Sequence, residues 1–167
     1  MWSKVDKNVR FGTNLRVCKL PYYKGVKRML LGEYTHSIDA KGRLFVPARY
    51  REELGETFII VKYEDNCIAV FSHTVWEKFV EKLLSASEVK ALTTKRIIFA
   101  SAQEVEPDQQ GRILVPAKLR AYAGLEKDVT IIGVSDHAEI WSTAVYEDYM
   151  EKNDGGSLLS KIEEASI

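Results

Sequence analysis

The chain has 167 residues, and its 24 basic and 24 acidic side chains give a formal net charge of zero at neutral pH. Hydrophobic residues make up 46% and charged residues 29%, a composition typical of a soluble globular protein. No apolar run reaches the ~18–20 residues that a membrane-spanning helix needs, so we expect no membrane partner. The length suits one ordinary domain or two small ones.

The first 28 residues differ from the rest in charge. They hold eight basic residues and one acidic residue, so this segment carries +7 and residues 29–167 carry −7. A secretory signal needs an apolar core of about 7–15 residues, which is missing here. Apolar residues occur singly, so we expect little stable structure. Three interpretations stay open: a start assigned upstream of a true start at Met29, a basic arm that grips phosphates, or an ordered cap.

A stretch of 17 residues occurs twice in the chain. Residues 39–55 read DAKGRLFVPARYREELG, and residues 108–124 read DQQGRILVPAKLRAYAG. Eight of the 17 positions are identical, whereas average residue usage predicts about one match by chance. The chain therefore contains an internal duplication. The identical pairs are Asp39/Asp108, Gly42/Gly111, Arg43/Arg112, Val46/Val115, Pro47/Pro116, Ala48/Ala117, Arg51/Arg120 and Gly55/Gly124.

Each copy is predicted to form a β-hairpin followed by a short helix. In the first copy, Asp39-x-x-Gly42 has the residues of a tight turn between a strand at 33–38 and a strand at 43–46. Pro47 is expected at the first helical position, and Gly55 ends the helix. The second copy repeats this scheme.

The remaining segments contain further predicted strands and helices. An apolar hairpin follows each copy, formed by 57–61 with 67–71 and by 129–132 with 138–141. Two helices between the copies are expected to start with capping boxes at residues 74–77 and 85–88. A helix through 145–150 ends at an Asn-Asp-Gly-Gly break, and a short polar helix at 157–165 follows.

The doubled DxxGR and VPA pattern, flanked by β segments, resembles the MraZ family of bacterial transcription factors. The resemblance covers about residues 29–150. Residues 29–43 look like the usual start of such a protein, and residues 96–102 and 139–141 look like later landmarks.

This resemblance implies an α+β fold. Two swapped-hairpin β-barrel modules of the AbrB/SpoVT type would be related by a pseudo-two-fold axis and flanked by short helices. We place the modules at residues 33–75 and 104–147. A helical linker at 76–103 would join them, after a basic extension at 1–28, and a C-terminal tail at 148–167 would follow.

The repeated residues give two sets of candidate site residues. Asp39, Gly42, Asp108 and Gly111 are expected to organise the turns. The candidate DNA-binding residues are all basic: Lys41, Arg43, Arg49, Arg51, Arg112, Lys118 and Arg120. A two-stranded ribbon fits the major groove of B-DNA, and a guanidinium suits phosphate oxygens or guanine edges.

Alternative roles remain open for these cations. Arg43 and Arg112 follow their turn aspartates by four residues, so each arginine either pairs with the carboxylate or points outward, and both roles are compatible. Arg49, Arg51, Lys118 and Arg120 also fit a solvated helix face. The first copy is the stronger candidate because the second has Gln110 in place of Lys41. His36 is expected to lie on a strand surface, with a phosphate contact as the alternative.

The acidic charge of residues 29–167 argues against a nucleic-acid partner, which normally meets a basic surface. Either the acids lie away from the turns, or several subunits combine weak sites. The resemblance implies the second, since MraZ-like proteins form ring-like homo-oligomers on tandem promoter repeats, with sites about 10 base pairs apart. It also implies a repressor of the division and cell-wall gene cluster, including its own promoter.

Other functions have weaker support in the sequence. The three histidines show no metal-ligand spacing, and no phosphate loop or nucleophile elbow occurs, so we expect neither enzyme activity, catalytic residues, a metal nor a cofactor. Cys18 and Cys67 suit free thiols in a reducing cytoplasm. The resemblance also implies association with the nucleoid. The alternative is an antitoxin-like module of the same fold that binds a protein partner through residues 155–167.

Overall fold

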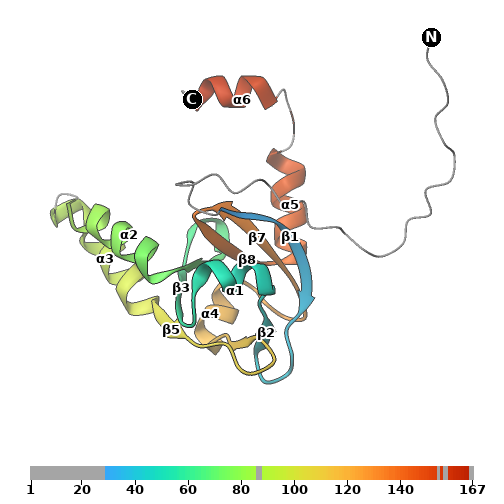
Figure 1. The fold of residues 1–167 in the computed structure, drawn as a ribbon. Helices are drawn as coiled ribbons and strands as arrows, with labels where there is room; N and C mark the ends of the chain where they lie inside the picture. The colour runs from blue at the N-terminus through green and yellow to red at the C-terminus, as the bar shows by residue number, and fades with distance from the viewer. Residues whose placement is uncertain (1–28, 86–87, 154, 156–157, 166–167) are drawn as a thin grey trace, which may run out of the picture.

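The computed structural model describes residues 29–85, 88–153, 155 and 158–165. The predictions for residues 1–28 and for Cys18 lie outside the described residues. The fold is α+β, as predicted (Figure 1). Its strands are β1 (Leu30–Ser37), β2 (Arg43–Phe45), β3 (Phe58–Lys62), β4 (Ile68–Phe71), β5 (Gln103–Val105), β6 (Arg112–Leu114), β7 (Asp128–Ser135) and β8 (His137–Ser142).

The helices of the described ranges lie between these strands and at the C-terminal side. They are α1 (Ala48–Leu54), α2 (His73–Ser85), α3 (Glu88–Ser101), α4 (Ala117–Tyr122), α5 (Thr143–Asn153) and α6 (Leu158–Glu164), with a 3-10 turn at Glu64–Asn66. No helix of the described segments is both long and apolar enough to cross a bilayer.

The strands form a six-stranded antiparallel sheet, in the order β1-β7-β8-β4-β3-β5, and a separate two-stranded ribbon of β2 and β6. The two copies exchange strands reciprocally. Strand β1 of the first copy pairs with β7 of the second, and β5 of the second pairs with β3 of the first. The two exchanged strand pairs have the same register. His36 of β1 pairs with Val129 of β7, and Val105 of β5, the repeat equivalent of His36, pairs with Phe58 of β3.

The predicted hairpin between residues 33–38 and 43–46 is therefore wrong in its strand pairing. The turn itself forms, since the N–H of Gly42 donates to the carbonyl of Asp39 at 2.8 Å. Beyond the turn, β1 joins the large sheet and β2 pairs with β6. The reason is burial: Leu44 and Ile113 on the inner face of the ribbon are both fully buried in the main core.

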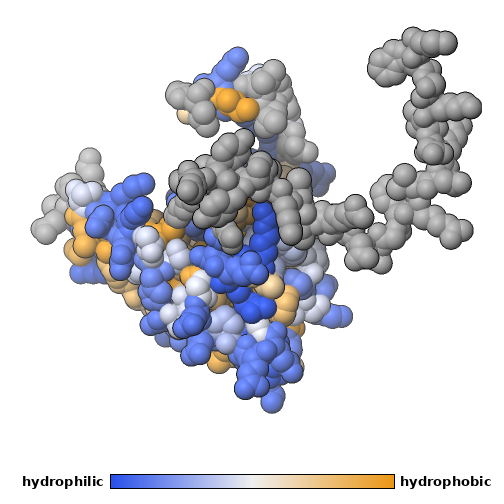
Figure 2. Space-filling view, in the orientation of Figure 1, coloured by the Kyte–Doolittle hydropathy of each residue, from blue (hydrophilic) through white to orange (hydrophobic). Residues whose placement is uncertain are grey.

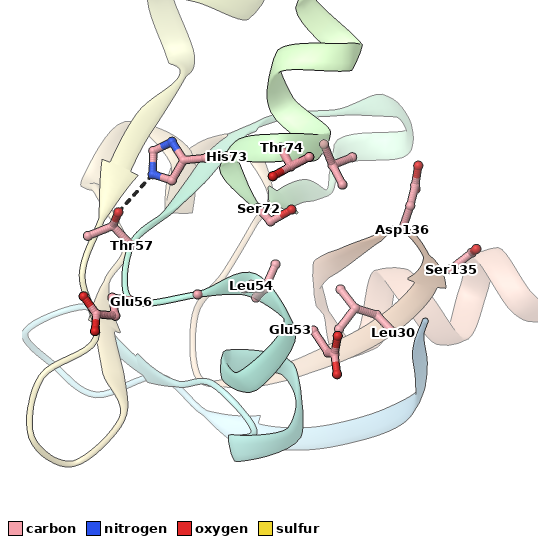
Figure 3. Close-up of a pocket in the computed structure, with 12 residues that line it drawn as sticks. Leu30, Glu53, Leu54, Glu56, Thr57, Ser72, His73, Thr74, Ser135 and Asp136 are labelled. Carbon is pink, nitrogen blue, oxygen red and sulfur yellow. Dashed lines mark hydrogen bonds between the residues drawn. The ribbon is translucent and has the colours of Figure 1, made fainter. Parts of the chain in front are cut away.

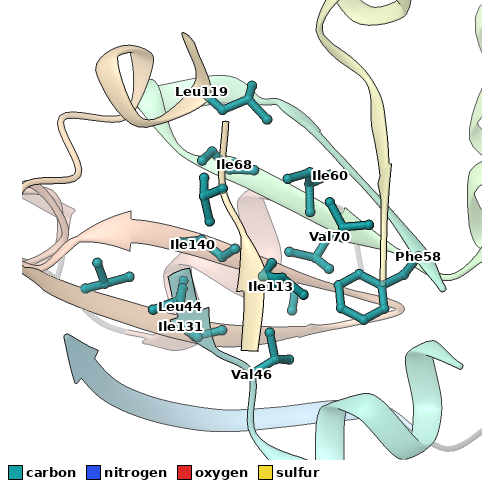
Figure 4. Close-up of a cluster of buried hydrophobic side chains, with 14 of the residues drawn as sticks. Leu44, Val46, Phe58, Ile60, Ile68, Val70, Ile113, Leu119, Ile131 and Ile140 are labelled. Atoms are coloured by element: carbon teal, nitrogen blue, oxygen red, sulfur yellow. The ribbon is translucent and has the colours of Figure 1, made fainter. Parts of the chain in front are cut away.

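The main core lies between the ribbon and the large sheet. Figure 4 shows Leu44 and Ile113 packed among side chains of β3, β4, β7 and β8. The hairpins β3–β4 and β7–β8 form as predicted, with their turns at Glu64–Asn66 and around Ser135. Both halves of the duplication thus contribute to one core.

The short helix of each copy begins one residue later than predicted. Pro47 and Pro116 are the N-cap residues of α1 and α4, and the first helical residues are Ala48 and Ala117. Gly124 follows α4 with a φ of +60°, the left-handed conformation expected after a helix end.

Both predicted capping boxes are wrong. The helix α2 begins at His73, and the carbonyl of Ser72 accepts the N–H groups of Val75 and Trp76. Ser85 is the last residue of α2 and not the cap of α3. The buried side chain of Val75, which packs on the second apolar cluster, is consistent with this earlier start.

The helices α2 and α3 form a hairpin that extends away from the sheet (Figure 1). Near the sheet, Trp76 and Phe79 pack with Phe71 in a second apolar cluster. Farther from the sheet, Leu84 and Leu92 of this hairpin are about half exposed. The predicted helix through 145–150 is confirmed as α5, and α6 lies within the predicted 157–165 range.

Candidate nucleic-acid interface

The turn of the first copy is organised by one carboxylate. Oδ1 of Asp39 accepts the backbone N–H groups of Lys41 and Arg43, each at 2.9 Å. Oδ2 accepts a hydrogen bond from Nε of Arg43 at 2.7 Å, and Nη2 lies 2.7 Å from the same oxygen as an ion pair. These bonds fix the turn and hold the guanidinium beside it, while about a third of the Arg43 side chain stays exposed.

The second copy has the same geometry. Oδ1 of Asp108 accepts the N–H groups of Gln110 and Arg112 at 2.9 and 3.0 Å. Oδ2 accepts Nε and Nη2 of Arg112 at 2.9 and 2.8 Å. Both aspartates thus organise their turns, and both arginines pair with them, which was one of the two roles that the sequence left open.

These bonds stabilise the charged form of both carboxylates. The backbone N–H and the guanidinium of Arg43 lower the pKa of Asp39 below its usual value. The side chain and then the backbone N–H of Arg112 lower the pKa of Asp108 to about 2. The two turns therefore keep their ion pairs at any pH near neutrality.

The two turns lie at opposite ends of the short antiparallel ribbon that joins them, since Arg43 pairs with Leu114 and Arg112 pairs with Phe45. The N–H of Val46 donates to the carbonyl of Gly111 at 3.0 Å, and that of Val115 donates to Gly42 at 2.8 Å. Each copy thus supplies a bond to the glycine of the other. The pair of turns forms one surface, which we call the turn face: residues 39–43 and 108–112.

Arg51 and Arg120 support the turn face from behind. Nε of Arg51 donates to the carbonyl of Val46 at 3.0 Å, and Nε of Arg120 donates to Val115 at 3.1 Å. Each guanidinium lies against the glycine of the opposite turn, Arg51 at Gly111 and Arg120 at Gly42. Both side chains are partly buried, in contrast to the exposed Arg49 of α1 and Lys118 of α4.

The cations of the turn face exceed its acids. The two aspartates are matched by Arg43 and Arg112. Within the described ranges, Lys41, Arg51 and Arg120 have no carboxylate at ion-pair distance. Figure 2 shows a hydrophilic surface at this end of the molecule.

Comparison with known proteins identifies the chain. Residues 29–97 and 98–165 each match the model of a family described as "MraZ protein, putative antitoxin-like". The two matches together span most of the sequence and divide it between the two copies. The chain belongs to the MraZ family.

Its relatives in this family are similar over most of their length. A "Transcriptional regulator MraZ" of Caldanaerobacter subterraneus subsp. tengcongensis is 48% identical over 130 residues, 75% of this chain and 90% of that protein. Proteins with the same name in Acetivibrio thermocellus and Desulfitobacterium hafniense are 50% identical over 125 and 123 residues. Each of these two matches covers 72% of this chain and 86% of the relative.

In this MraZ chain the outer face of the ribbon adds two residues that the sequence did not mark as candidates, Phe45 and Leu114. Strand alternation places Arg43 and Phe45 of β2 and Arg112 and Leu114 of β6 on that face, opposite the buried Leu44 and Ile113. The alternation is visible in the sequence, but the pairing of β2 with β6 is not.

His36 lies beside this ribbon. Its ring contacts the edge of Phe45 with centroids 5.1 Å apart, and burial lowers its pKa. Its Nε2 is buried and has no hydrogen-bond partner among the described residues. This arrangement is a packing contact of a half-buried strand histidine.

A cavity of about 480 Å³ lies at the opposite end of β1, between the end of α1, the start of α2 and the β7–β8 turn (Figure 3). Its lining includes the acids Glu53, Glu56 and Asp136. Leu30 also lines it, and the eight residues from Leu30 to Ser37 span roughly 23 Å along an extended strand. Several acids of the first copy therefore lie away from the turn face.

Proposed function

We propose that this chain is a sequence-specific DNA-binding transcriptional regulator, and that the turn face is its DNA-binding surface. The observation that carries the proposal is the arrangement of the two turns: Arg43 and Arg112 are each fixed by an aspartate and lie diagonally across the outer face of one ribbon. A ribbon of this width fits the major groove. The names of the relatives agree with this role.

The seven candidate basic residues have three different roles in this proposal. Arg43 and Arg112 keep donors that their aspartates do not use, and these contact base edges or phosphates. Lys41 of the first turn and the exposed Arg49 and Lys118 contact phosphates. The remaining two, Arg51 and Arg120, stiffen the turns and add positive charge. A partly preorganised surface loses less entropy on binding.

We also propose a fold type for the two copies, on the basis of the strands that they exchange. The reciprocal pairing of β1 with β7 and of β5 with β3 supports two swapped-hairpin modules of AbrB/SpoVT type, at residues 33–75 and 104–147. Residues 76–103 join them, and residues 148–167 form a tail. Related turns from the two modules then flank one ribbon face, which suits a duplex.

Self-assembly supplies the affinity that one weak site lacks. The chain forms a ring-like homo-oligomer on tandem promoter repeats, so that several turn faces bind adjacent sites about 10 base pairs apart. Exposed apolar side chains on the α2–α3 hairpin offer a self-association surface (Figure 2). They are Leu84, Leu92, Ile97 and Phe99.

The biological role is the one that the family implies. The protein acts in the cytoplasm at the nucleoid, and represses the division and cell-wall gene cluster, its own promoter included, by occluding that promoter. Chromatin capture of the native protein followed by footprinting at the enriched promoters tests this. Enrichment of one promoter with evenly spaced protected repeats is expected, and an Arg43→Ala variant loses it. Capture without any enriched promoter contradicts the proposal.

The second candidate is an antitoxin-like protein-interaction module, which the wording of the family description favours. In that case residues 155–167 bind the protein partner. A chain ending at Lys152 separates the two candidates in a gel-shift experiment. If the chain is a DNA regulator, the truncated chain still shifts the captured promoter. If it is an antitoxin, the truncated chain no longer binds its protein partner.

A further inference from the structure

Leu114 is the most exposed large apolar side chain in the described part of the chain, with 59% of its surface accessible. A single exposed leucine needs no explanation by itself. Its position on the turn-face ribbon makes it informative, because every other apolar side chain of β2 and β6 is covered at least in part.

The repeat equivalent of Leu114 in the first copy has a different environment. Phe45 packs against the ring of His36, with centroids 5.1 Å apart, and lies 5.9 Å from the guanidinium of Arg51. In the second copy His36 is replaced by the smaller, buried Val105. On the outer face of the ribbon, Phe45 is therefore partly covered by its neighbours, whereas its repeat equivalent Leu114 is exposed.

The neighbours of Leu114 on this face are cationic. Arg43 is its direct cross-strand partner, and Arg112 precedes it by two residues on the same face of β6. Directly paired residues place their Cβ atoms about 4.5–5.5 Å apart. A partner that meets this face must therefore offer an apolar group next to negative charge or hydrogen-bond acceptors.

Duplex DNA offers that combination in its major groove. The C5-methyl group of thymine is the apolar group there, and it lies next to the acceptors of neighbouring guanines and to the phosphates. We propose that Leu114 contacts a thymine methyl beside the base pair that Arg43 contacts, and so determines specificity for thymine. This inference rests on the proposed DNA-binding function and deepens it.

Deoxyuridine tests the contact, because it lacks only the C5-methyl group of thymine. Duplexes are first selected by the full-length chain from a random library, and each thymine is then replaced in turn. With the unmodified protein, replacement at one thymine position per site weakens binding by about fourfold. That is the loss of affinity expected when one buried methyl group is removed. Leu114→Ala binds the original duplex about as weakly as the unmodified protein binds the duplex that contains deoxyuridine. For this variant, replacing the thymine has no further effect.

Two further variants complete the design. Leu114→Met keeps the apolar bulk and restores sensitivity to the replacement. Leu31→Ala is the matched control, since Leu31 is exposed at the far end of β1, away from the turn face. It keeps the full response of the unmodified protein.

Three outcomes overturn the inference. No thymine position responds, or Leu114→Ala retains the full penalty, or Leu114→Ala changes the subunit number in sedimentation, which assigns the leucine to self-association. In each case, loss of duplex binding in Arg43→Ala shows that the proposed function stands alone. If the unmodified chain selects no duplex, the proposed function and the inference fail together.

Discussion

The guanidinium of Arg51 occupies the space that a side chain on Gly111 would need. A Cβ atom on Gly111 would stand 2.7 Å from Cζ of Arg51, and one on Gly42 would stand 2.8 Å from Nε of Arg120. Both glycines also have a positive φ, +76° and +81°. Each turn therefore requires glycine for its backbone and for the arginine of the other copy.

Gly111→Ala is expected to destabilise the protein more than an ordinary glycine substitution. The left-handed backbone costs about 1–2 kcal/mol for alanine, and displacing the Arg51 guanidinium from its bond to the carbonyl of Val46 adds about 0.5–1.5 kcal/mol. Gly124→Ala is the matched control, because Gly124 has a φ of +60° but nothing within 4 Å of its Cβ position. Urea unfolding of both variants gives the difference, and equal losses would contradict the contact.

A double variant isolates the arginine. Truncation in Arg51→Ala frees the space beside Gly111, so the combination of both changes costs less free energy of unfolding than the sum of the two single changes. A strictly additive result would place the cost of Gly111→Ala in the backbone alone.

Arg43→Ala is expected to weaken binding to a selected duplex by about 1–3 kcal/mol, because it removes the guanidinium that Asp39 presents at the turn face. Equilibrium titration at one fixed salt concentration measures the loss. Lys152→Ala, on the exposed surface of α5, is the control and leaves affinity unchanged. Unchanged affinity in a folded, still oligomeric Arg43→Ala would exclude this contact.

The local chemistry of the turns was predictable from the sequence, whereas their environment was not. Asp39 and Gly42 indicate a turn by their own residue types, and the duplication indicates that residue 108 repeats it. The pairing of β2 with β6 depends on burying Leu44 and Ile113 together, across about 69 residues of chain. No local pattern encodes that choice.

The supporting contacts were hidden for the same reason. Arg51 and Arg120 fit a solvated helix face by spacing alone, yet each reaches the turn of the other copy. The missed start of α2 has a different cause: Ser72 and Thr74 are both suitable cap residues, and packing of Val75 decides between them. Sequence patterns limited the choices, and tertiary contacts selected among them.

The difference between the copies at Lys41 and Gln110 predicts opposite effects on salt dependence. Lys41→Ala removes one phosphate contact and should make the slope of log affinity against log salt shallower by about 0.9. Gln110→Lys should make it steeper by about the same amount, since the two turns have the same geometry. Titrations over a range of salt concentrations measure both slopes. If both variants keep the original slope, neither turn tip faces a phosphate.

Acid should destabilise the protein through the turn aspartates. The pKa of Asp108 is lowered from 3.8 to about 2 by Arg112, so its contribution to folding is complete above about pH 4 and is lost as the pH falls toward 2. Asp108→Asn should lower stability at neutral pH and flatten this acid dependence. Urea unfolding between about pH 2 and 5 measures the effect, and an Asn variant with the original dependence would assign it to other carboxyls.

At the other end of the sheet, His137 predicts the opposite dependence. The ring is largely buried and stacks on Phe71, with centroids 5.1 Å apart. Nδ1 lies 2.9 Å from Oδ1 of Asp136, and Nε2 lies 3.4 Å from Oε1 of Glu139, an ion-pair distance without hydrogen-bond geometry. Burial lowers the pKa of His137, but the two carboxylates raise it by more, so the pKa lies above its ordinary value of 6.5.

Stability should therefore fall as the pH rises above neutrality. A raised folded-state pKa gives a contribution that is complete below pH 6.5 and is lost as the pH rises through the folded value, because the neutral ring no longer attracts Asp136 and Glu139. His137→Gln should remove this decline while keeping a polar side chain in the β7–β8 turn. Urea unfolding from about pH 6 to 9 measures it, with His73→Gln as the exposed-histidine control. If the decline persists in His137→Gln, another group must titrate, because this variant has no imidazole beside Asp136 and Glu139 that could lose a proton.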